Sequence, residues 1–213
     1  LAAAASGPVA EGNVGGGTGM ICHGFKGGIG TASRVLTEQD GGYTLGVLVQ
    51  ANHGARERLT IAGAPVGAEI TDLRPAEPPA PDLPSSSIIA VVATDCPLLP
   101  HQLRRLAQRV SLGIGRVGGL GENSSGDIFI AFSTAPLGTE SAGGVRQVGM
   151  LANNRMNALF AATVQATEEA IVNALVAAED MTGQRGRTVY ALPIDRLQMV
   201  LRQHNRLMEG AIH

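Results

Sequence analysis

The feature that most constrains the fold is a junction at which a proline-rich run gives way to a β-branched one. Five prolines lie between Pro75 and Pro84. Proline fixes φ and has no amide donor, so this lead-in is neither a helix nor a central strand. Three serines at 85–87 then precede the apolar run 88–93, which has the length and composition of a central strand. Hydroxyl groups held between a loose loop and a buried strand indicate a polar turn, or a nucleophile beside a cleavage point.

Composition favours an ordinary globular core. The 213 residues suit one large domain or two small ones, and 44% hydrophobic residues provide a core without disulfides or a structural metal. Aromatic residues make up 3%, with no Trp, which argues against stacking platforms for single-stranded nucleic acid. The formal charge is −2 and no basic stripe occurs, so neither nucleic acid nor a membrane surface is expected as a partner. No run reaches transmembrane length.

The cysteines and histidines show no metal-binding pattern. Cys22 and Cys96 are the two cysteines and neither lies in a CxxC, so we expect no disulfide framework, no zinc site and a reducing compartment. His23 beside Cys22 suggests a metal, but no second pair completes the site. We interpret His53 and His101 as structural or solvent-facing, and Cys96 as a small buried apolar residue.

A dense glycine run, Gly12-Asn-Val-Gly-Gly-Gly-Thr-Gly-Met20, indicates backbone in special conformations or in close packing, as where chains cross. It lacks the G-x-x-x-x-G-K-[ST] pattern of a phosphate loop, and Lys26 precedes glycines rather than following them. We therefore reject a nucleotide loop. A formal G-x-G-x-x-G at 113–118 follows a helical pattern rather than a strand, and we interpret it as the end of a helix.

Hydrophobic periodicity predicts a mixture of strands and amphipathic helices, and hence layered sheets with helices covering their outer faces. The expected strands are a hairpin of 29–36 and 43–50, a more exposed pair at 56–61 and 64–70, buried strands at 88–93 and 128–132, and a short strand at 189–192. The expected helices are 1–6, one opened by Pro97 and Pro100, 154–182, and 193–208.

Polar residues stand at the ends of three of these strands. Asn52 follows one, Ser87 precedes another, and Ser125 and Asp127 precede a third. Functional groups are commonly built on such rigid elements, so we take these four residues as the candidate catalytic set.

Five motifs in order then carry a resemblance to a known family. The chain resembles the DmpA family of L-aminopeptidase/D-esterase and β-aminopeptidase enzymes over essentially its whole length. The motifs are Gly12 to Met20, Val49-Gln-Ala-Asn52, Ser87-Ile-Ile to Ala93-Thr-Asp95, Pro97-Leu-Leu-Pro-His-Gln-Leu103 and Ser125-Gly-Asp-Ile-Phe129.

The resemblance implies an α/β (α+β) fold, a four-layer αββα sandwich of two sheets covered by helices. It implies a single domain over 1–213 that is N-terminally truncated relative to the family, without a tyrosine that the missing part supplies. It also implies a precursor that cuts itself, leaving 1–86 as the rest of an α chain and 87–213 as the β chain. No cofactor is implied, and the expected assembly is a homotetramer.

By the same resemblance, Ser87 becomes the N-terminal nucleophile, Asn52 helps hold the oxyanion, and Ser125 and Asp127 lie around the nucleophile. A free α-amine, with a reference pKa of roughly 7.7–8.0, suits the role of base for that hydroxyl. Asp127 also suits attraction of a substrate ammonium. The residue before the nucleophile is Ser86, where the family commonly has Gly or Asn, so Ser85 and Ser86 remain alternative new termini.

The expected function is that of a self-processing serine aminopeptidase, amidase or esterase, acting on short peptides, amides or esters in the cytoplasm, with the periplasm as the alternative. Two other functions stay open. One is an acyltransferase like the ornithine acetyltransferases, which typically expose Thr where this chain has Ser87. The other is an uncleaved, non-catalytic binding homologue.

Overall fold

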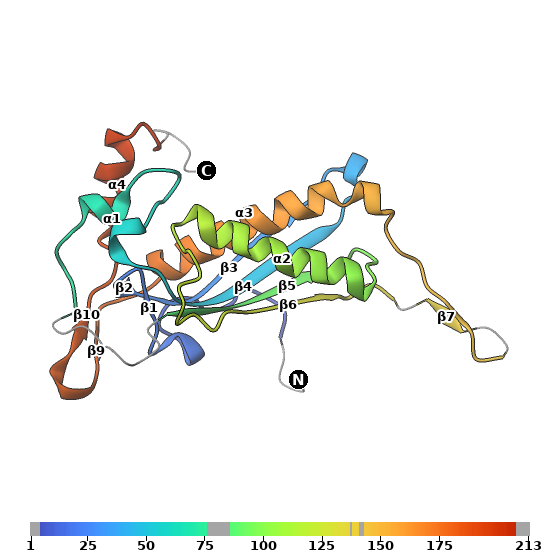
Figure 1. Ribbon diagram of the computed structural model, residues 1–213, viewed down its shortest axis with the longest axis horizontal. Helices are drawn as coiled ribbons and strands as arrows, with labels where there is room; N and C mark the ends of the chain where they lie inside the picture. Colours follow the sequence, from blue (N-terminus) through green and yellow to red (C-terminus); the bar gives the residue numbers. More distant parts are fainter. Residues whose placement is uncertain (1–4, 76–85, 137, 141–142, 208–213) are drawn as a thin grey trace.

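The computed structural model describes residues 5–75, 86–136, 138–140 and 143–207, and its centre is a four-stranded sheet in the order β3-β4-β5-β6. The first three strands are antiparallel, whereas β5 and β6 run parallel. A parallel pair needs a crossover connection, and α2 provides it (Figure 1). The bounds are β3 Gly28–Val35, β4 Thr44–Asn52, β5 Ser87–Thr94, α2 Pro100–Arg116 and β6 Ile128–Ser133.

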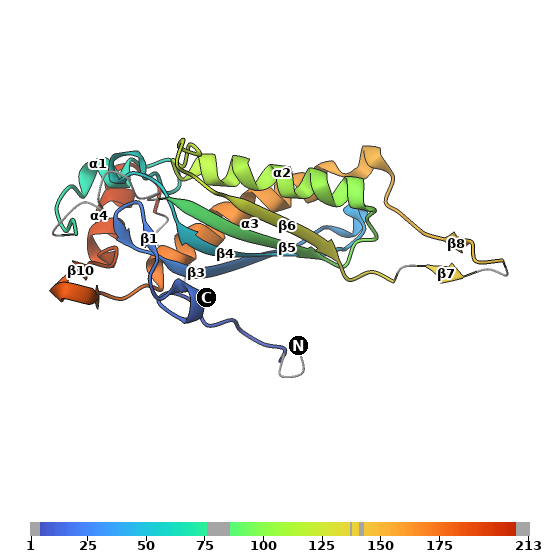
Figure 2. The ribbon, with the colours of Figure 1, turned by 60° about the horizontal axis from the view of Figure 1, so that its bottom comes forward.

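Two helices cover one face of this sheet (Figures 1 and 2). The helix α3 (Asn157–Val176) packs on β3 and β4, and α2 packs on β6 and α3. Glycines allow the close approach: a Cβ at Gly30 of β3 would lie 1.9 Å from the Ala170 carbonyl oxygen of α3. A Cβ at Gly113 of α2 would lie 2.6 Å from the Thr167 Cβ. The formal G-x-G-x-x-G therefore begins within a helix crossing and does not form a phosphate loop.

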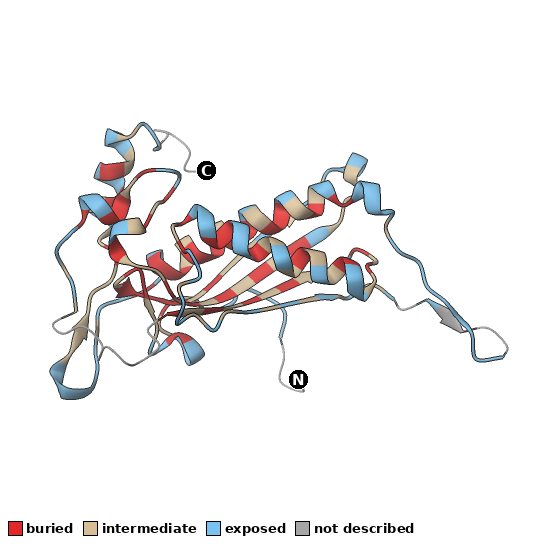
Figure 3. Ribbon diagram, in the orientation of Figure 1, coloured by how far each residue is buried: buried red, intermediate tan, exposed pale blue. Residues whose placement is uncertain are grey.

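Apolar residues on the opposite face of the sheet are left exposed by the described part of the chain, and Figure 3 colours the ribbon by this burial. Ile128, Ile130 and Phe132 of β6 are 52%, 50% and 44% exposed. The prediction that 128–132 is a buried strand is thus wrong for this face, because one side of β6 packs under α2 and the other side has no covering layer here. Asn52 and Ser87 lie on the same uncovered face, since side chains alternate along β4 and β5.

Small elements gather at one end of the sheet, and a hairpin of β7 and β8 projects from the other end (Figures 1 and 2). The helices α1 and α4 pack together, and Arg196 of α4 forms an ion pair with Asp72 in the segment that follows α1. Among the described residues, no helix is long and apolar enough to cross a bilayer. The bounds are β1 Ile21–Cys22, β2 Phe25–Lys26, α1 Val66–Glu69, β7 Thr139–Glu140, β8 Arg146–Gln147, β9 Met181–Thr182, β10 Thr188–Val189 and α4 Ile194–Gln203, with 3-10 turns at Gly15–Gly17, Glu38–Asp40, Arg56–Arg58, Asn153–Arg155 and Gln184–Gly186.

The glycine-rich segment is a tight crossing of chains, as predicted. Gly12 pairs with Ile29 in an isolated bridge, and a Cβ at Gly28 would lie 2.0 Å from the Gly12 carbonyl oxygen. Lys26 is buried, and its Nζ donates to the carbonyl oxygens of Gly17, Met20 and Gly27 at 2.7–3.1 Å. Burial lowers the pKa of this lysine to about 8. Lys26 thus holds the loop from inside and does not face a phosphate.

The predicted hairpin and the strand 88–93 are confirmed as β3, β4 and β5, but the second strand pair is wrong. Its place is taken by a 3-10 turn, Arg56–Arg58, and by α1. The cause is Arg56, whose guanidinium is buried. It donates to carbonyl oxygens from segments before and after it in the sequence, and the chain curves around the guanidinium instead of extending as strands. Those carbonyls belong to His23, Gly24, Ile70, Asp72 and Leu73.

The predicted helices are confirmed in position but are shorter than expected. The predicted helix 154–182 ends at Val176, and 193–208 corresponds to α4. The predicted strand 189–192 is reduced to β10. The predicted helix 1–6 lies largely outside the described residues, and its last two residues, 5 and 6, are not helical. Most of the proline-rich run, 76–85, also lies outside them.

Candidate active site

The site is built where β4 ends and where β5 and β6 begin. Asn52, the last residue of β4, is the direct register partner of Ser87, the first residue of β5. Because β5 and β6 are parallel, with Ile89 opposite Ile128, the start of β6 lies beside the start of β5. The structure therefore brings the four predicted residues, Asn52, Ser87, Ser125 and Asp127, to one corner of the sheet.

The Ser87 hydroxyl is held by main-chain groups on both sides. The Gly126 amide donates to Ser87 Oγ at 2.9 Å, and Oγ donates to the Ser86 carbonyl oxygen at 2.8 Å. The hydroxyl oxygen thus lies directly beside the carbonyl group of the Ser86–Ser87 peptide bond. Ser86 is 8% exposed, so this peptide bond enters the strand already shielded from solvent.

Asn52 presents a defined end of its amide group. The Ile21 amide donates to Asn52 Oδ1 at 2.9 Å. A backbone N–H can only donate, so the atom facing it must be the amide oxygen, and Nδ2 is left as the donor end. A fixed donor on the residue opposite a hydroxyl is the arrangement needed to stabilise a developing oxyanion.

Ser125 and Asp127 form a small network that joins β5 to β6. Ser125 Oγ donates to Asp127 Oδ1 at 2.5 Å, and the Ile88 amide donates to the same oxygen at 3.0 Å. Asp127 therefore fixes the residue after Ser87 and orients Ser125. The Gly126 amide that bonds to Ser87 Oγ lies between them, so this network also positions that donor.

Two residues of the corner were not predicted from the sequence. Gly126 acts through its backbone, which no side-chain pattern indicates. Glu122 forms an ion pair with Arg58 and accepts a hydrogen bond from Ser86 Oγ at 3.4 Å. The sequence did contain a signal for Glu122. It lies just before the 123–127 segment, and polar residues that lead into a strand had already been taken as candidates.

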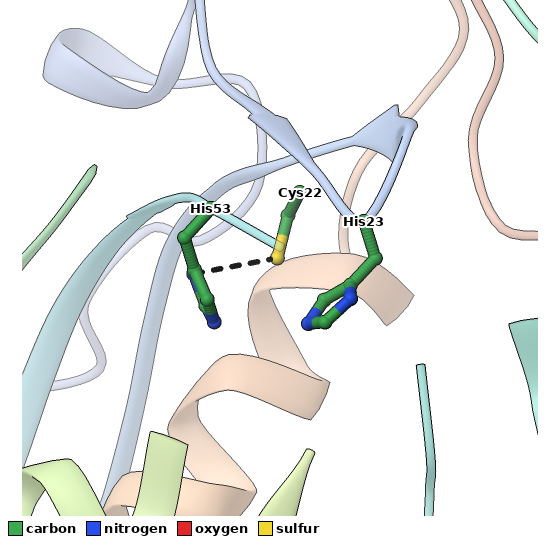
Figure 4. Close-up of side chains that lie close together, drawn as sticks. All are labelled: Cys22, His23 and His53. Carbon is green, nitrogen blue, oxygen red and sulfur yellow. Dashed lines mark hydrogen bonds between the residues drawn. The ribbon is translucent and has the colours of Figure 1, made fainter. Parts of the chain in front are cut away.

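A second polar group lies close by. His53, the residue after Asn52, joins Cys22 and His23 in a buried cluster (Figure 4). We expected no second pair to complete the Cys22–His23 pair, and the structure adds one residue, His53, which the end of β4 brings across from a distant part of the sequence. Cys96 is buried as predicted, and burial raises the pKa of its thiol to about 11. His101 is exposed on α2.

Comparison with known proteins gives consistent matches. The family model of peptidase family S58 matches residues 1–189. The chain is 51% identical to "Beta-peptidyl aminopeptidase BapA" of Sphingosinicella microcystinivorans, over 96% of this chain and 54% of that protein. It is 49% identical to the protein of the same name from Sphingosinicella xenopeptidilytica, over 95% of this chain and 53% of that one. The chain thus spans about half the length of the curated relatives it matches.

Solved structures agree in fold. The L-aminopeptidase D-Ala-esterase/amidase of Ochrobactrum anthropi, described as a prototype for the serine aminopeptidases and a variant of the Ntn hydrolase fold, matches with a TM-score of 0.83 at 54% identity. That match covers 96% of this chain and 55% of the other. A β-aminopeptidase of Burkholderia sp. matches with a TM-score of 0.81 at 54% identity, over 95% and 56% of the two chains. These matches confirm the predicted fold class.

Proposed function

Because the chain belongs to peptidase family S58, as its sequence motifs indicated, we propose that it provides the nucleophile of a self-processing serine aminopeptidase. The proposed substrates are short peptides, amides or esters with a free amino end. The observation that carries this proposal is the position of Ser87 Oγ, between the Gly126 amide and the Ser86 carbonyl and opposite Asn52. The named relatives are aminopeptidases, which favours hydrolysis over acyl transfer to ornithine.

The first reaction is the cut between Ser86 and Ser87. Ser87 Oγ attacks the Ser86 carbonyl carbon, the C–N bond breaks, and the hydroxyl proton ends on the Ser87 nitrogen. The product is an ester between Ser86 and the Ser87 side chain. Water then hydrolyses this ester, which leaves a Ser86 carboxylate and a free Ser87 amine. The 2.8 Å contact of Oγ with the Ser86 carbonyl oxygen supports this step, since the attacking atom already lies beside the group it attacks.

The second reaction uses the amine that the cut releases. A neutral Ser87 amine accepts the Oγ proton as Oγ attacks a substrate carbonyl, and the same proton goes to the leaving amine. The acyl group is transferred to Oγ, and water then releases it. An unshifted α-amine has a pKa of roughly 7.7–8.0, so a useful share is neutral near physiological pH.

The remaining candidate residues have supporting roles in this scheme. Asn52 Nδ2 donates to the oxyanion of each tetrahedral intermediate. Asp127 is a positioning residue, since its Oδ1 holds the Ile88 amide and Ser125 Oγ. Its second oxygen, Oδ2, provides negative charge for the ammonium group of a substrate, which explains a requirement for a free amino end.

Intact mass under denaturing conditions tests the proposal. The unmodified protein is expected to give two pieces that separate before Ser87, whereas Ser87→Ala is expected to stay in one piece and to release no p-nitroaniline from alanine anilides. Ser86→Ala is the matched control, because it changes the residue on the other side of the bond and keeps the nucleophile. Cleavage or hydrolysis that persists in Ser87→Ala would contradict the proposal, and a single uncut species would favour the binding homologue.

The assembly and compartment belong to the same proposal. We propose a homotetramer in a reducing cytoplasm, where the buried cysteines Cys22 and Cys96 do not form disulfides. Light scattering coupled to size-exclusion chromatography measures the assembly directly, and a monomer would contradict this part.

A further inference from the structure

The cluster of Cys22, His23 and His53 is built from two distant segments of the chain (Figure 4). Cys22 ends β1, His23 begins the turn that follows, and His53 comes directly after β4. The three are buried, with exposures of 0%, 0% and 4%. Each offers one sulfur or nitrogen atom, and these atoms all lie within 4.8 Å of one another.

Two nitrogens of this cluster have no hydrogen-bond partner. His23 Nε2 and His53 Nε2 are both buried and unpaired. Buried polar atoms without partners are costly and uncommon, so a pair of them in one place points to a missing ligand. The two rings lie 5.1 Å apart, edge to face, and thus border the same space.

One hydrogen bond fixes which nitrogen of His23 can bind a cation. His23 Nδ1 lies 3.0 Å from the Ala55 carbonyl oxygen. A carbonyl only accepts, so Nδ1 carries the proton, and the lone pair of the neutral ring is on Nε2. A histidine that donates one ring N–H to a backbone carbonyl and faces the cluster with its other nitrogen has the usual arrangement of a metal ligand. Cys22 Sγ lies 3.8 Å from His53 Nδ1.

Both rings are neutral, as a ligand must be. Burial lowers the pKa of His53 to about 3, and burial also lowers the pKa of His23. Burial raises the pKa of the Cys22 thiol to about 12, so the thiol is protonated until an ion displaces its proton. Each binding event therefore releases one proton, from Cys22.

We propose that Cys22, His23 and His53 form a binding site for one thiophilic d10 metal cation, with copper(I) favoured over zinc(II). Sulfur and imidazole ligands select such ions. In a site with metal–ligand distances of about 2.0–2.3 Å, the ligand atoms lie roughly 3.3–3.7 Å apart. The present atoms lie within 4.8 Å of one another, so a closure of about 1 Å brings them to that spacing.

Charge decides between the two ions. One thiolate and two neutral imidazoles make a copper(I) site neutral, whereas zinc(II) leaves a net positive charge. Arg56 lies against the cluster, with its Nε donating to the His23 carbonyl oxygen at 2.8 Å. Arg58 is nearby but is paired with Glu122. A buried positive charge beside the Arg56 guanidinium is unfavourable, so the neutral complex is preferred.

The site also joins segments that hold the candidate oxyanion donor. The Ile21 amide, next to Cys22, fixes Asn52, next to His53. The His23 amide further donates to the His53 carbonyl oxygen at 2.7 Å. A bound ion would therefore clamp the turn after β1 to the end of β4. The metal proposal itself rests on the cluster and not on the proposed hydrolysis.

The test is a titration of the purified, chelator-treated protein with copper(I) under anaerobic, reducing conditions, with bicinchoninate as the competing ligand. We expect one tight ion per chain and a higher melting temperature with copper. Cys22→Ala, His23→Gln and His53→Gln are each expected to weaken binding by at least about 100-fold. Cys96→Ala and His101→Gln are the matched controls, because they remove a buried cysteine and an exposed histidine elsewhere, and both should bind copper normally.

X-ray absorption of the copper-loaded unmodified protein keeps the proposal testable if a variant fails to fold. A shell of one sulfur and two nitrogens is expected. Absence of tight binding, a shell without sulfur, or undiminished binding in a folded Cys22→Ala would overturn the site. A parallel zinc titration that gave the tighter complex would overturn the preference for copper(I).

Discussion

At the scale of single residues, the corner of the sheet depends on which end of the Asn52 amide is left available as a donor. The Ile21 N–H settles this, because it can bond only to the oxygen. Asn52 thus accepts through Oδ1 and keeps Nδ2 as its donor group. The acceptor role and the donor role can be separated by replacing the side-chain nitrogen with oxygen.

Asn52→Asp makes that change. Aspartate keeps an oxygen for the Ile21 amide but replaces the Nδ2 donor with a second oxygen. We expect kcat for an aminoacyl anilide to fall by about 10²–10³-fold, the usual cost of one oxyanion donor, with little change in melting temperature. Asn52→Ala should lose both bonds and therefore also some stability. A kcat unaffected in Asn52→Asp would remove Asn52 from the oxyanion site.

At the scale of elements, the distance between the helix α3 and the strand β3 depends on a glycine, Gly30. Gly30 has no room for a side chain, since its Cβ would lie 1.9 Å from a carbonyl oxygen of α3. Gly46, in the neighbouring strand, would place its Cβ on the uncovered face with nothing within 4 Å. The two glycines therefore serve as a matched pair.

Gly30→Ala is expected to lower the free energy of unfolding by about 1–3 kcal/mol, because α3 must move away from β3. Gly46→Ala should be neutral or stabilising by about 0.5–1 kcal/mol, since alanine loses less backbone entropy in a strand. Both are measured by urea denaturation in the Ser87→Ala background, where the chain is expected to stay in one piece. Equal effects of the two substitutions would contradict this account of the packing.

Element identity was predictable where periodicity or turn chemistry was strong. Hydrophobic periodicity and the β-branched run after Ser87 located the central strands, and the two prolines located the start of α2. The segment around Arg56 was not predictable, because its shape follows from five carbonyls that gather only in the folded chain. The exposed side of β6 could not be recognised either. A run of apolar residues predicts a strand buried on both faces, and the sequence does not show whether a second layer covers the outer face.

The same limit applies to the site. Ser87, Asn52, Ser125 and Asp127 were identified from strand ends and family motifs, and the structure brings them together. The Gly126 and Ile21 amides were missed, because backbone donors depend on strand register rather than on residue type. His53 was missed as a neighbour of Cys22 for the same reason.

At the scale of the whole molecule, the proposed cut divides the central sheet. The strands β3 and β4 lie in residues 1–86, whereas β5, β6, α2 and α3 lie in 87–213. The full ladder between β4 and β5, from Leu45↔Thr94 to Asn52↔Ser87, therefore joins the two pieces. The helix α3 also packs across the division, onto β3 and β4.

We expect the two pieces to stay together after the cut. Native size-exclusion chromatography should give one peak that contains both, and the pieces should separate only in denaturant. Neither piece expressed alone should show the melting transition of the pair. Dissociation of the cut protein in native buffer would contradict the joint sheet. Ser87→Ala, uncut, is the control that shows the elution volume of the connected chain.

Division of the sheet changes the folding reaction from a unimolecular to a bimolecular one. Before the cut, β4 finds β5 within one chain, and stability does not depend on how much protein is present. After it, the same ladder is an association between two molecules, so the unfolding midpoint rises with protein concentration. Dilution then becomes a denaturing condition for the mature protein but not for its precursor. Self-cleavage would thus convert a folding equilibrium into a dissociation equilibrium, without altering a contact of the sheet.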